Sequence, residues 1–256
     1  MDDSAAVLTE RRGRTLVVTL NRPKVKNAAN MAMAEGMEAA MATLRDDPEL
    51  WVGVITGTGG DFCAGGDISE NKPVATPEGG SFGFFASPPD KTLIAAIEGV
   101  AVGGGLELAL VCDLIVAARD ARLGLPEVRH SMMALGGGLV RLPRRLPYHV
   151  AMDMILTGEL RRAEELAGFG LVNRLCEPGA ALETALDLAE RVCRNGPVAV
   201  NHSRHIVQAV DRLPGEAAVL EFQGDEITLE ALQTTEDFAE GSRAFLEKRP
   251  PVWQNH

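Results

Sequence analysis

Short apolar runs and helix-like patterns alternate along the first two thirds of the chain. Four apolar runs predict strands, and they cover residues 14–20, 51–56, 93–97 and 114–118. Between the first two runs, residues 31–45 predict a helix, because apolar side chains from Met33 to Leu44 recur at the spacing of one buried face. A second helix is predicted over 106–111. Periodicity alone therefore predicts an α/β fold with an ordinary open sheet.

The pattern changes after about residue 181, where helices replace strands. Residues 182–193 carry apolar side chains on one helical face, Gly196 and Pro197 end that helix, and a further helical stretch is predicted from Gly215 into the tail. Residues 71–90 are rich in proline, glycine and serine and have no period, which predicts a long loop of the kind that is more often functional than idle. Its aromatic pair at 84–85 could cover a pocket.

Charge and cysteine usage exclude several classes of protein. The 256 residues carry a formal net charge of −11 with no run of Lys and Arg, which argues against a nucleic-acid partner. Charged residues interrupt every long apolar run, and acidic residues stand where a secretory signal would be basic, so we expect no membrane span and a cytoplasmic protein. The four cysteines lie far apart without CxxC spacing, which predicts buried free thiols.

Three consecutive glycines in the stretch VAVGGGLELAL, residues 100–110, lead directly into a glutamate on an apolar helix. Neither the GxGxxG nor the P-loop pattern fits there, so nucleotide hydrolysis is not indicated. Glycine lets peptide N–H groups approach a ligand closely, and a helix N-terminus favours negative charge. We therefore predict an oxyanion site at 103–105, with Glu107 beside it and a second donor from the glycine-rich turn at 63–67. The alternative is a plain tight turn.

A second carboxylate is a candidate for proton transfer, because one group must take a proton and another must give one. Glu127 follows Pro126, which restricts the backbone before it, and the glycines at 136–138 come next. The alternative interpretation of Glu127 is a solvated surface carboxylate. His130 could tune that acid or touch a substrate, or be a solvated bystander. The other histidines have no metal-ligand spacing, so no metal site is predicted.

Motifs spread over residues 14–253 carry a resemblance to a known family. They are NRP at 21–23, NA at 27–28, DFCAGGDI at 61–68, IAAIEG at 94–99, GGGLELA at 103–109, CD at 112–113, PE at 126–127, LTG at 156–158, AEE at 163–165, GLVN at 170–173 and AFLEKR at 244–249. In this order the sequence resembles the crotonase, or enoyl-CoA hydratase/isomerase, superfamily. Residues near 128 and 142–147, with the tail at 251–253, look more like the branch of carnitinyl-CoA dehydratase and related bacterial paralogues.

The resemblance implies a fold and an assembly that periodicity alone does not. It implies a spiral of ββα turns over residues 1–195, which holds the site for a CoA thioester, followed by a helical segment over 196–256 used in trimerisation. Trimers of the family often pair into hexamers. The implied partners are an acyl-CoA substrate and further copies of the chain, and no cofactor is implied because coenzyme A enters as part of the substrate.

The resemblance also assigns roles to particular residues. The thioester oxygen is held by the N–H groups of Gly66 and Gly104, Glu107 is the base on water, and Glu127 is the acid to the alpha carbon. The remaining substrate-binding residues are expected to be Val25, Ala64, Asp67, Ile68, Gly103 and Pro126. The implied reaction is the reversible addition of water to a trans-2-enoyl-CoA.

Other activities stay open within the same fold. An enoyl-CoA isomerase can operate with one carboxylate, and an acyl-CoA hydrolase is a further alternative. A non-catalytic acyl-CoA binding protein is a third, because residues 128–135 depart from the usual hydratase pattern. Ser131 and Met132 reshape the wall beside Glu127, which leaves the natural acyl group open.

Overall fold

The computed structural model describes residues 5–70, 74–210 and 233–255. A six-stranded sheet forms its centre, and its strands lie in the order β1, β2, β3, β6, β8, β11. Their bounds are β1 Val7–Arg12, β2 Thr15–Leu20, β3 Val52–Gly57, β6 Thr92–Ile97, β8 Leu114–Ala118 and β11 Arg174–Cys176. Only β1 pairs antiparallel, with β2, and the other neighbours are parallel. Every residue of β6 is buried, as expected for a parallel strand covered on both faces.

A second layer of short strands follows the first. β7 (Val100–Val102) pairs parallel with β9 (Arg122–Gly124), which pairs antiparallel with β10 (Arg161–Arg162). Single bridges join Cys63 to Ala101 and Ala29 to Gly66, so earlier turns of the chain enter this layer too. Successive turns thus give a long strand to the large sheet and a short strand or a single bridge to the second layer. An α-helix follows in the turns that begin with β2, β6 and β8, whereas the turn that begins with β3 has none among its described residues. This is the ββα spiral that the resemblance implies.

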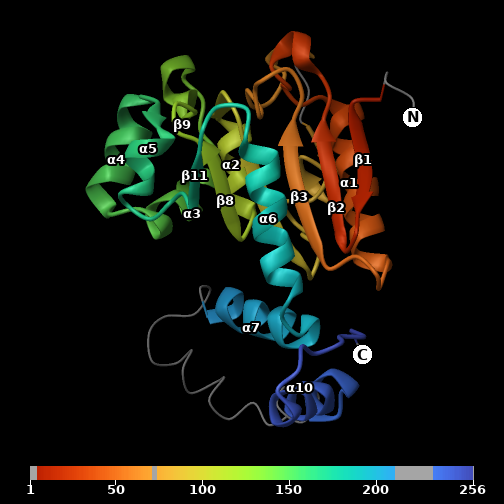
Figure 1. The fold of residues 1–256 in the computed structure, drawn as a ribbon. Helices are drawn as coiled ribbons and strands as arrows, with labels where there is room; N and C mark the ends of the chain where they lie inside the picture. Colours follow the sequence, from red (N-terminus) through yellow and green to blue (C-terminus); the bar gives the residue numbers. More distant parts are fainter. Residues whose placement is uncertain (1–4, 71–73, 211–232, 256) are drawn as a thin grey trace.

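Helices cover both faces of the large sheet and extend beyond it. Figure 1 shows α6 crossing one face and α3, α4 and α5 gathered beyond the β11 edge, while α7 and α10 lie past one end of the strands. The helices are α1 Met31–Asp46, α2 Gly104–Val111, α3 Gly138–Arg145, α4 Tyr148–Thr157, α5 Ala163–Ala167, α6 Ala181–Cys193, α7 Pro197–Val210 and α10 Glu236–Glu247, with short 3-10 turns η1 Pro23–Val25, η2 Ile68–Glu70 and η3 Pro126–His130. No helix of the described ranges is long and apolar enough to cross a bilayer.

Most predicted elements are confirmed near their predicted ends. The methionine stripe of α1 is buried, and Asn30 caps this helix by accepting from the N–H of Met33 at 3.1 Å. The long loop prediction was wrong in part, because β4 (Ala75–Thr76) and β5 (Gly80–Ser81) form a small hairpin inside it. The helical stretch predicted from Gly215 lies in part outside the described residues, and α10 is the portion described.

Several elements had no sequence prediction. They are β1, β7, β9, β10, β11, α3, α4, α5 and α7. The helix predicted to stop at Gly196 and Pro197 does end before them, at Cys193. Pro197 is also the first residue of α7, a position where its missing N–H costs nothing. Short elements of this kind depend on partners elsewhere in the chain, so their own sequence carries a weak signal.

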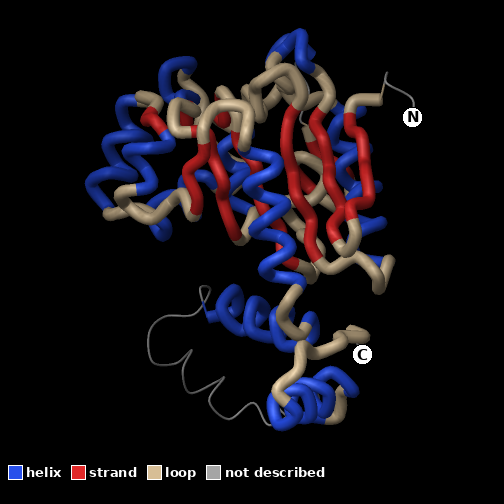
Figure 2. The backbone as a smooth tube through the Cα atoms, viewed as in Figure 1, coloured by secondary structure: helices blue, strands red, loops and turns tan. Residues whose placement is uncertain are grey.

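Figure 2 shows the C-terminal helices past one end of the strands. Polar contacts join this segment to the spiral. Arg204 of α7 donates its Nε–H to Asp113 at 2.7 Å, just before β8. The indole N–H of Trp253 reaches the carbonyl of Arg194 at 2.9 Å, after α6. On α10, Glu240 accepts from Arg249 at 2.6 and 2.9 Å, and this pairing lowers the pKa of Glu240 to about 2. The tail is thereby fixed against α10.

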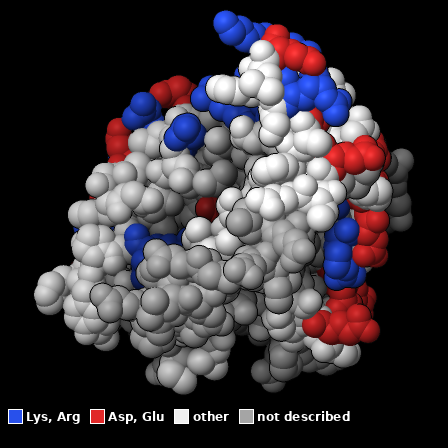
Figure 3. Space-filling model, turned by 90° about the horizontal axis from the view of Figure 1, so that it is seen from below, with Lys and Arg blue, Asp and Glu red and all other residues white. Residues whose placement is uncertain are grey.

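Acidic and basic side chains are mixed on one face of the molecule. On the face drawn in Figure 3, red and blue side chains lie beside one another along the rim, and the described part of that face carries no broad field of one sign.

Candidate active site

Two glycine-rich turns, far apart in sequence, meet at the N-terminus of α2. The bridges of the second layer bring residues 63–66 beside residues 101–104, because Cys63 pairs with Ala101 and Ala29 pairs with Gly66. Gly65 has φ +97°, and a Cβ there would lie 3.3 Å from the nitrogen of Gly104. Among the described residues, the N–H groups of Gly66 and Gly104 donate to no other group. Two free donors therefore border one space.

A buried asparagine holds the first of these turns in place. Asn27 accepts from the N–H of Arg22 at 2.8 Å and donates its amide hydrogens to the carbonyls of Thr58 and Asp61, at 2.9 and 2.7 Å. A Cβ on Gly57 would lie 2.6 Å from the Asn27 amide nitrogen, so the strand end has to be glycine. Asn27, from the NA motif, therefore holds in place the loop that leads to Gly66.

Each glycine at the start of α2 is required for a different reason. Gly103 has φ +56°, and a Cβ there would lie 3.1 Å from an oxygen of Glu127. A Cβ on Gly104 would collide with the ring of Phe82, and one on Gly105 with the carbonyl of Cys63. A Cβ on Gly66 would meet nothing within 4 Å. Close packing explains why residues 103–105 are glycines, whereas the space beside Gly66 is open.

Glu107 lies on the first turns of α2 and is only 5 % exposed. Its Oε1 accepts from the N–H of Gly138 at 2.8 Å, and the N–H of Gly136 also stabilises the carboxylate. Burial raises the pKa of Glu107, while these two N–H groups and the positive charge of Arg141 oppose that rise. The glycines at 136–138 thus serve Glu107, although in sequence they follow Glu127.

The glycine loop itself is held by a side chain of α3. Arg141 donates from Nη1 to the carbonyl of Gly136 at 2.9 Å, and a Cβ on Gly137 would collide with the same guanidinium. A Cβ on Gly136 would lie 2.6 Å from Oε2 of Glu107, and one on Gly138 would lie 3.0 Å from Oε1. The carboxylate therefore occupies a cradle that only glycine leaves open.

Glu127 lies across the same cavity, in η3, and its surroundings differ. Its Oε2 is buried and has no hydrogen-bond partner among the described residues. Burial raises the pKa of Glu127, and the charge of Glu107 raises it further, against one backbone hydrogen bond that lowers it. A carboxyl group placed in this way favours its neutral, proton-bearing form.

One cavity of about 800 Å³ joins these groups. Its walls contain Ala28, Ala64, Gly65, Gly66, Asp67, Ile68, Val74, Ala75, Ser81, Phe82, Gly103, Gly104, Glu107, Pro126, Glu127, His130, Met132 and Gly136. The structure therefore brings every predicted site residue except Val25 to one space. Val25, in η1, is exposed and is not among the wall residues. His130 also lines the cavity.

The aromatic wall of the cavity was only partly anticipated. Phe82 lines it, whereas Phe84 is buried in the core and Phe85 stacks on Phe82 with ring centroids 4.9 Å apart. The aromatic cluster at 82–85 was visible in the sequence, but which ring faces the cavity depends on the backbone of the loop. Asp67, in the cavity wall, forms an ion pair with Arg22 at 3.0 Å. A hydrogen bond from the Ser69 side chain lowers the pKa of Asp67 most, and Arg22 lowers it further.

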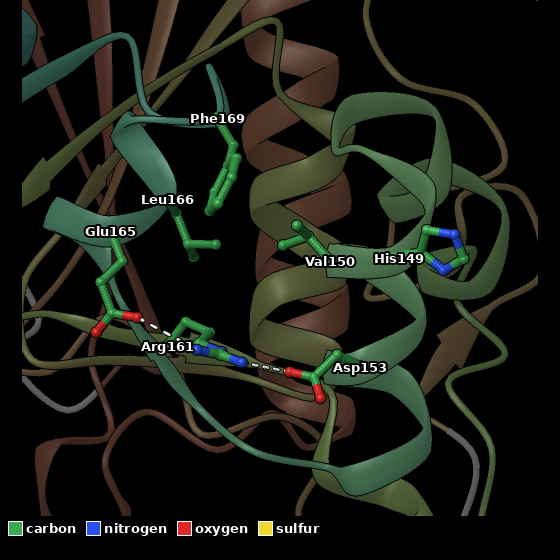
Figure 4. A pocket seen from close by; sticks show the side chains of 7 residues that line it. All are labelled: His149, Val150, Asp153, Arg161, Glu165, Leu166 and Phe169. Atoms are coloured by element: carbon green, nitrogen blue, oxygen red, sulfur yellow. Dashed lines mark hydrogen bonds and ion pairs between the residues drawn. The ribbon is translucent and has the colours of Figure 1, made fainter.

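A second cavity, of about 260 Å³, lies between α4 and α5. Figure 4 shows its apolar side chains Val150, Leu166 and Phe169, and Arg161 held between Asp153 and Glu165. The charge of Arg161 is already matched there by two carboxylates. Within the described ranges, no group of three His, Cys, Asp or Glu side chains could hold a metal ion.

Known proteins match the chain over nearly its whole length. The profile of a family described as enoyl-CoA hydratase/isomerase matches residues 10–256. The enoyl-CoA hydratase EchA19 of Mycobacterium tuberculosis is 37% identical over 260 residues, which cover 97% of this chain and 96% of that protein. The carnitinyl-CoA dehydratase of Salmonella enteritidis is 36% identical over 252 residues, covering 95% and 96%.

A solved structure agrees with the fold. The crystal structure of an enoyl-CoA hydratase from Mycobacterium tuberculosis matches with a TM-score of 0.94 at 45% sequence identity, over 99% of this chain and 100% of the other. These matches confirm the family resemblance and the spiral fold that the motifs predicted, including its C-terminal helices. The chain belongs to the enoyl-CoA hydratase/isomerase family, the crotonase superfamily.

Proposed function

We propose that this protein adds water reversibly to the double bond of a trans-2-enoyl-CoA thioester. The observation that carries the proposal is the pair of glutamates with opposite surroundings, on one cavity that also has two free peptide N–H groups. Water addition needs one group to accept a proton and another to donate one, and it needs donors where negative charge develops. Relatives named enoyl-CoA hydratase and carnitinyl-CoA dehydratase support a carbon–oxygen lyase.

The surroundings of the two carboxyl groups assign their roles. Glu107 accepts from peptide N–H groups and lies near Arg141, which both favour its ionised form, and we assign it the proton taken from water as the water oxygen bonds to the beta carbon. Glu127 keeps its proton because its Oε2 has no donor, and it transfers that proton to the alpha carbon. In the reverse direction the two proton transfers run backwards, with loss of water.

Negative charge develops on the carbonyl oxygen of the thioester during the reaction. As the water oxygen attacks, the electron pair of the double bond moves toward the carbonyl oxygen and gives an enolate. The N–H groups of Gly66 and Gly104 donate to that oxygen, and the N-terminus of α2 adds a favourable dipole. Both donors are in place before the charge develops, so little reorganisation is needed during the reaction.

The rest of the thioester has a matching environment at the mouth of the cavity. We expect the nucleotide end of coenzyme A to lie against Ala64, Asp67 and Ile68, which line the cavity. The part near the reacting carbons is expected to contact Gly103 and Pro126. Val25 would contact coenzyme A only outside the cavity. Coenzyme A is part of the substrate, and the proton transfers of Glu107 and Glu127 need no further cofactor. We also propose that the spiral core ends at residue 195 and the helical C-terminal segment begins at residue 196. Copies of this chain are expected to assemble into a trimer or a pair of trimers.

Hydration is tested by the absorbance of the conjugated thioester, which disappears when water adds. Purified protein is mixed with crotonyl-CoA, alongside Glu107→Gln, Glu127→Gln and the surface control Glu159→Gln. We expect turnover by the native protein, a fall of about 10² or more in each cavity variant, and native turnover in the control.

Other results would replace the proposal. Movement of a beta,gamma double bond without hydration would indicate an isomerase, and release of free coenzyme A would indicate a hydrolase. Binding of acyl-CoA with no turnover of any of these substrates would indicate a non-catalytic binding protein.

A further inference from the structure

Exposed and buried residues both line the cavity. Ile68, beside the first glycine turn, is 75% exposed, while Phe82 is 6% exposed. A CoA thioester joins a large charged nucleotide to an acyl group, and the charged part has to stay in water. The acyl group therefore belongs in the buried part of the cavity, which Phe82 lines.

Phe82 has a backbone conformation that is unusual for an aromatic residue. Its φ is +55°, in the left-handed region where side chains with a Cβ are rarely found. Its N–H donates to the carbonyl of Val74 at 2.9 Å, and its ring lies parallel to that of Phe85 within 4°. Phe85 in turn meets Phe84 edge to face at 5.3 Å. Strain at a residue that lines a cavity points to a role for its side chain there.

The aromatic pair spans the reacting groups. The ring of Phe82 occupies the space that a Cβ on Gly104 would need, so it lies against one of the two oxyanion donors. A Cβ on Gly136 would lie 3.0 Å from Cε2 of Phe85 and 2.6 Å from Oε2 of Glu107, so Phe85 reaches the surroundings of the base. Phe82 thus lines the cavity beside Gly104, and Phe85 stacks on its ring without lining the cavity itself.

We propose that Phe82 is the residue that determines acyl-chain specificity, and that it limits the protein to short, unbranched acyl groups. This inference rests on the proposed hydratase function. The ring is buried, supported by Phe85 and set against Gly104, so it does not move aside without disturbing the oxyanion glycine. Carbons beyond the beta position meet a closed aromatic surface, and a branch next to them meets the same wall.

Phe82→Gly is the most direct test, because glycine adopts the same left-handed backbone without cost and removes the whole ring. Hydration of trans-2-enoyl-CoA thioesters with 4, 8 and 12 acyl carbons is compared by kcat/KM. We expect the native protein to prefer the shortest, and Phe82→Gly to raise the ratio for the 8-carbon over the 4-carbon substrate by about 10-fold or more. The control is Phe84→Leu, which alters a buried aromatic side chain of the same loop away from the cavity.

A second measurement separates this inference from the proposed function. Calorimetric binding of saturated butyryl-CoA and octanoyl-CoA needs no turnover, and the same change in preference is expected in the binding constants. If nothing is hydrated but Phe82→Gly still improves octanoyl-CoA binding relative to butyryl-CoA, the function fails and the specificity role stands. An unchanged ratio in both measurements, or an equal change in Phe84→Leu, would overturn the inference.

Discussion

Glu107 and Glu127 border the same cavity, yet the molecule treats them in opposite ways. Glu107 is more deeply buried and receives peptide N–H groups from the glycine loop, with Arg141 behind it. Glu127 has an oxygen with no partner and feels the charge of Glu107. Burial raises both pKa values, so burial alone does not distinguish a base from an acid. The hydrogen bonds differ, because two peptide N–H groups of the glycine loop stabilise the charged form of Glu107 and a single backbone N–H group stabilises that of Glu127.

The largest expected effect separates the two carboxyl groups by a partial reaction. A saturated acyl-CoA has no double bond to hydrate, but its alpha proton can exchange with solvent through a group beside the alpha carbon. Glu127→Gln should lose this exchange by about 10² or more, while Glu107→Gln should keep most of it. The measurement is deuterium incorporation from heavy water, followed by mass spectrometry. Loss of equal size in both variants would show that the two groups do not have separate roles.

A smaller effect is expected when the support of Glu107 is weakened. Arg141→Met removes a positive charge that lowers the pKa of Glu107, so that pKa rises. The base must be ionised in the free enzyme, so kcat/KM falls as the pH drops through the pKa of Glu107. In the variant this decline begins at higher pH, with kcat/KM on the order of tenfold lower at acidic pH and closer to native at alkaline pH.

A full pH profile of kcat/KM tests this role of Arg141, with Arg141→Lys as the matched variant. Lysine keeps the charge, so its acid limb should stay near the native position even where the hydrogen bond to the carbonyl of Gly136 is lost. A uniform decrease of kcat/KM at every pH in Arg141→Met would mean that the residue only supports the fold of α3 and its loop.

The smallest effect concerns stability, and we expect its size to differ between the two sites. The pKa of Glu127 is raised in the folded state above its ordinary value of 4.5, so folding favours the protonated form. The stability that this group contributes is complete below about pH 4.5 and is lost as the pH rises through the folded-state pKa. Glu127→Gln should therefore stabilise the protein at neutral pH, by about 1 kcal/mol or less, because glutamine carries no charge to desolvate.

Thermal melting at pH 5 and pH 8 measures this difference. The melting temperature of Glu127→Gln should exceed that of the native protein more at pH 8 than at pH 5, by about 2–4 °C for each kcal/mol. Glu107→Gln should show no comparable gain, because the N–H groups of the glycine loop lose a charged acceptor. A gain of the same size in both variants would contradict the comparison of the two carboxyl groups.

The sequence alone determined much of this protein. The periodicity of residues 31–45 and the apolar runs at 51–56, 93–97 and 114–118 predicted elements that are present, because buried faces leave a repeating signal. The ordered motifs identified the family, and the family implied the spiral fold. Periodicity alone had predicted an ordinary open sheet. Gly103, Gly104 and Glu107 line one cavity, and their role there stays a prediction.

Only the tertiary structure decided how these parts act on one another. The pairing of residues 63–66 with residues 101–104 places two N–H donors together across a gap that no local pattern encodes. The glycines at 136–138 serve Glu107 instead of the nearer Glu127, and Phe82 instead of Phe84 faces the cavity. Sequence motifs report which residue types a site needs, whereas hydrogen bonding, burial and strain depend on neighbours that the chain brings from afar. That is the physical reason why the candidates were readable from the sequence and their division of labour was not.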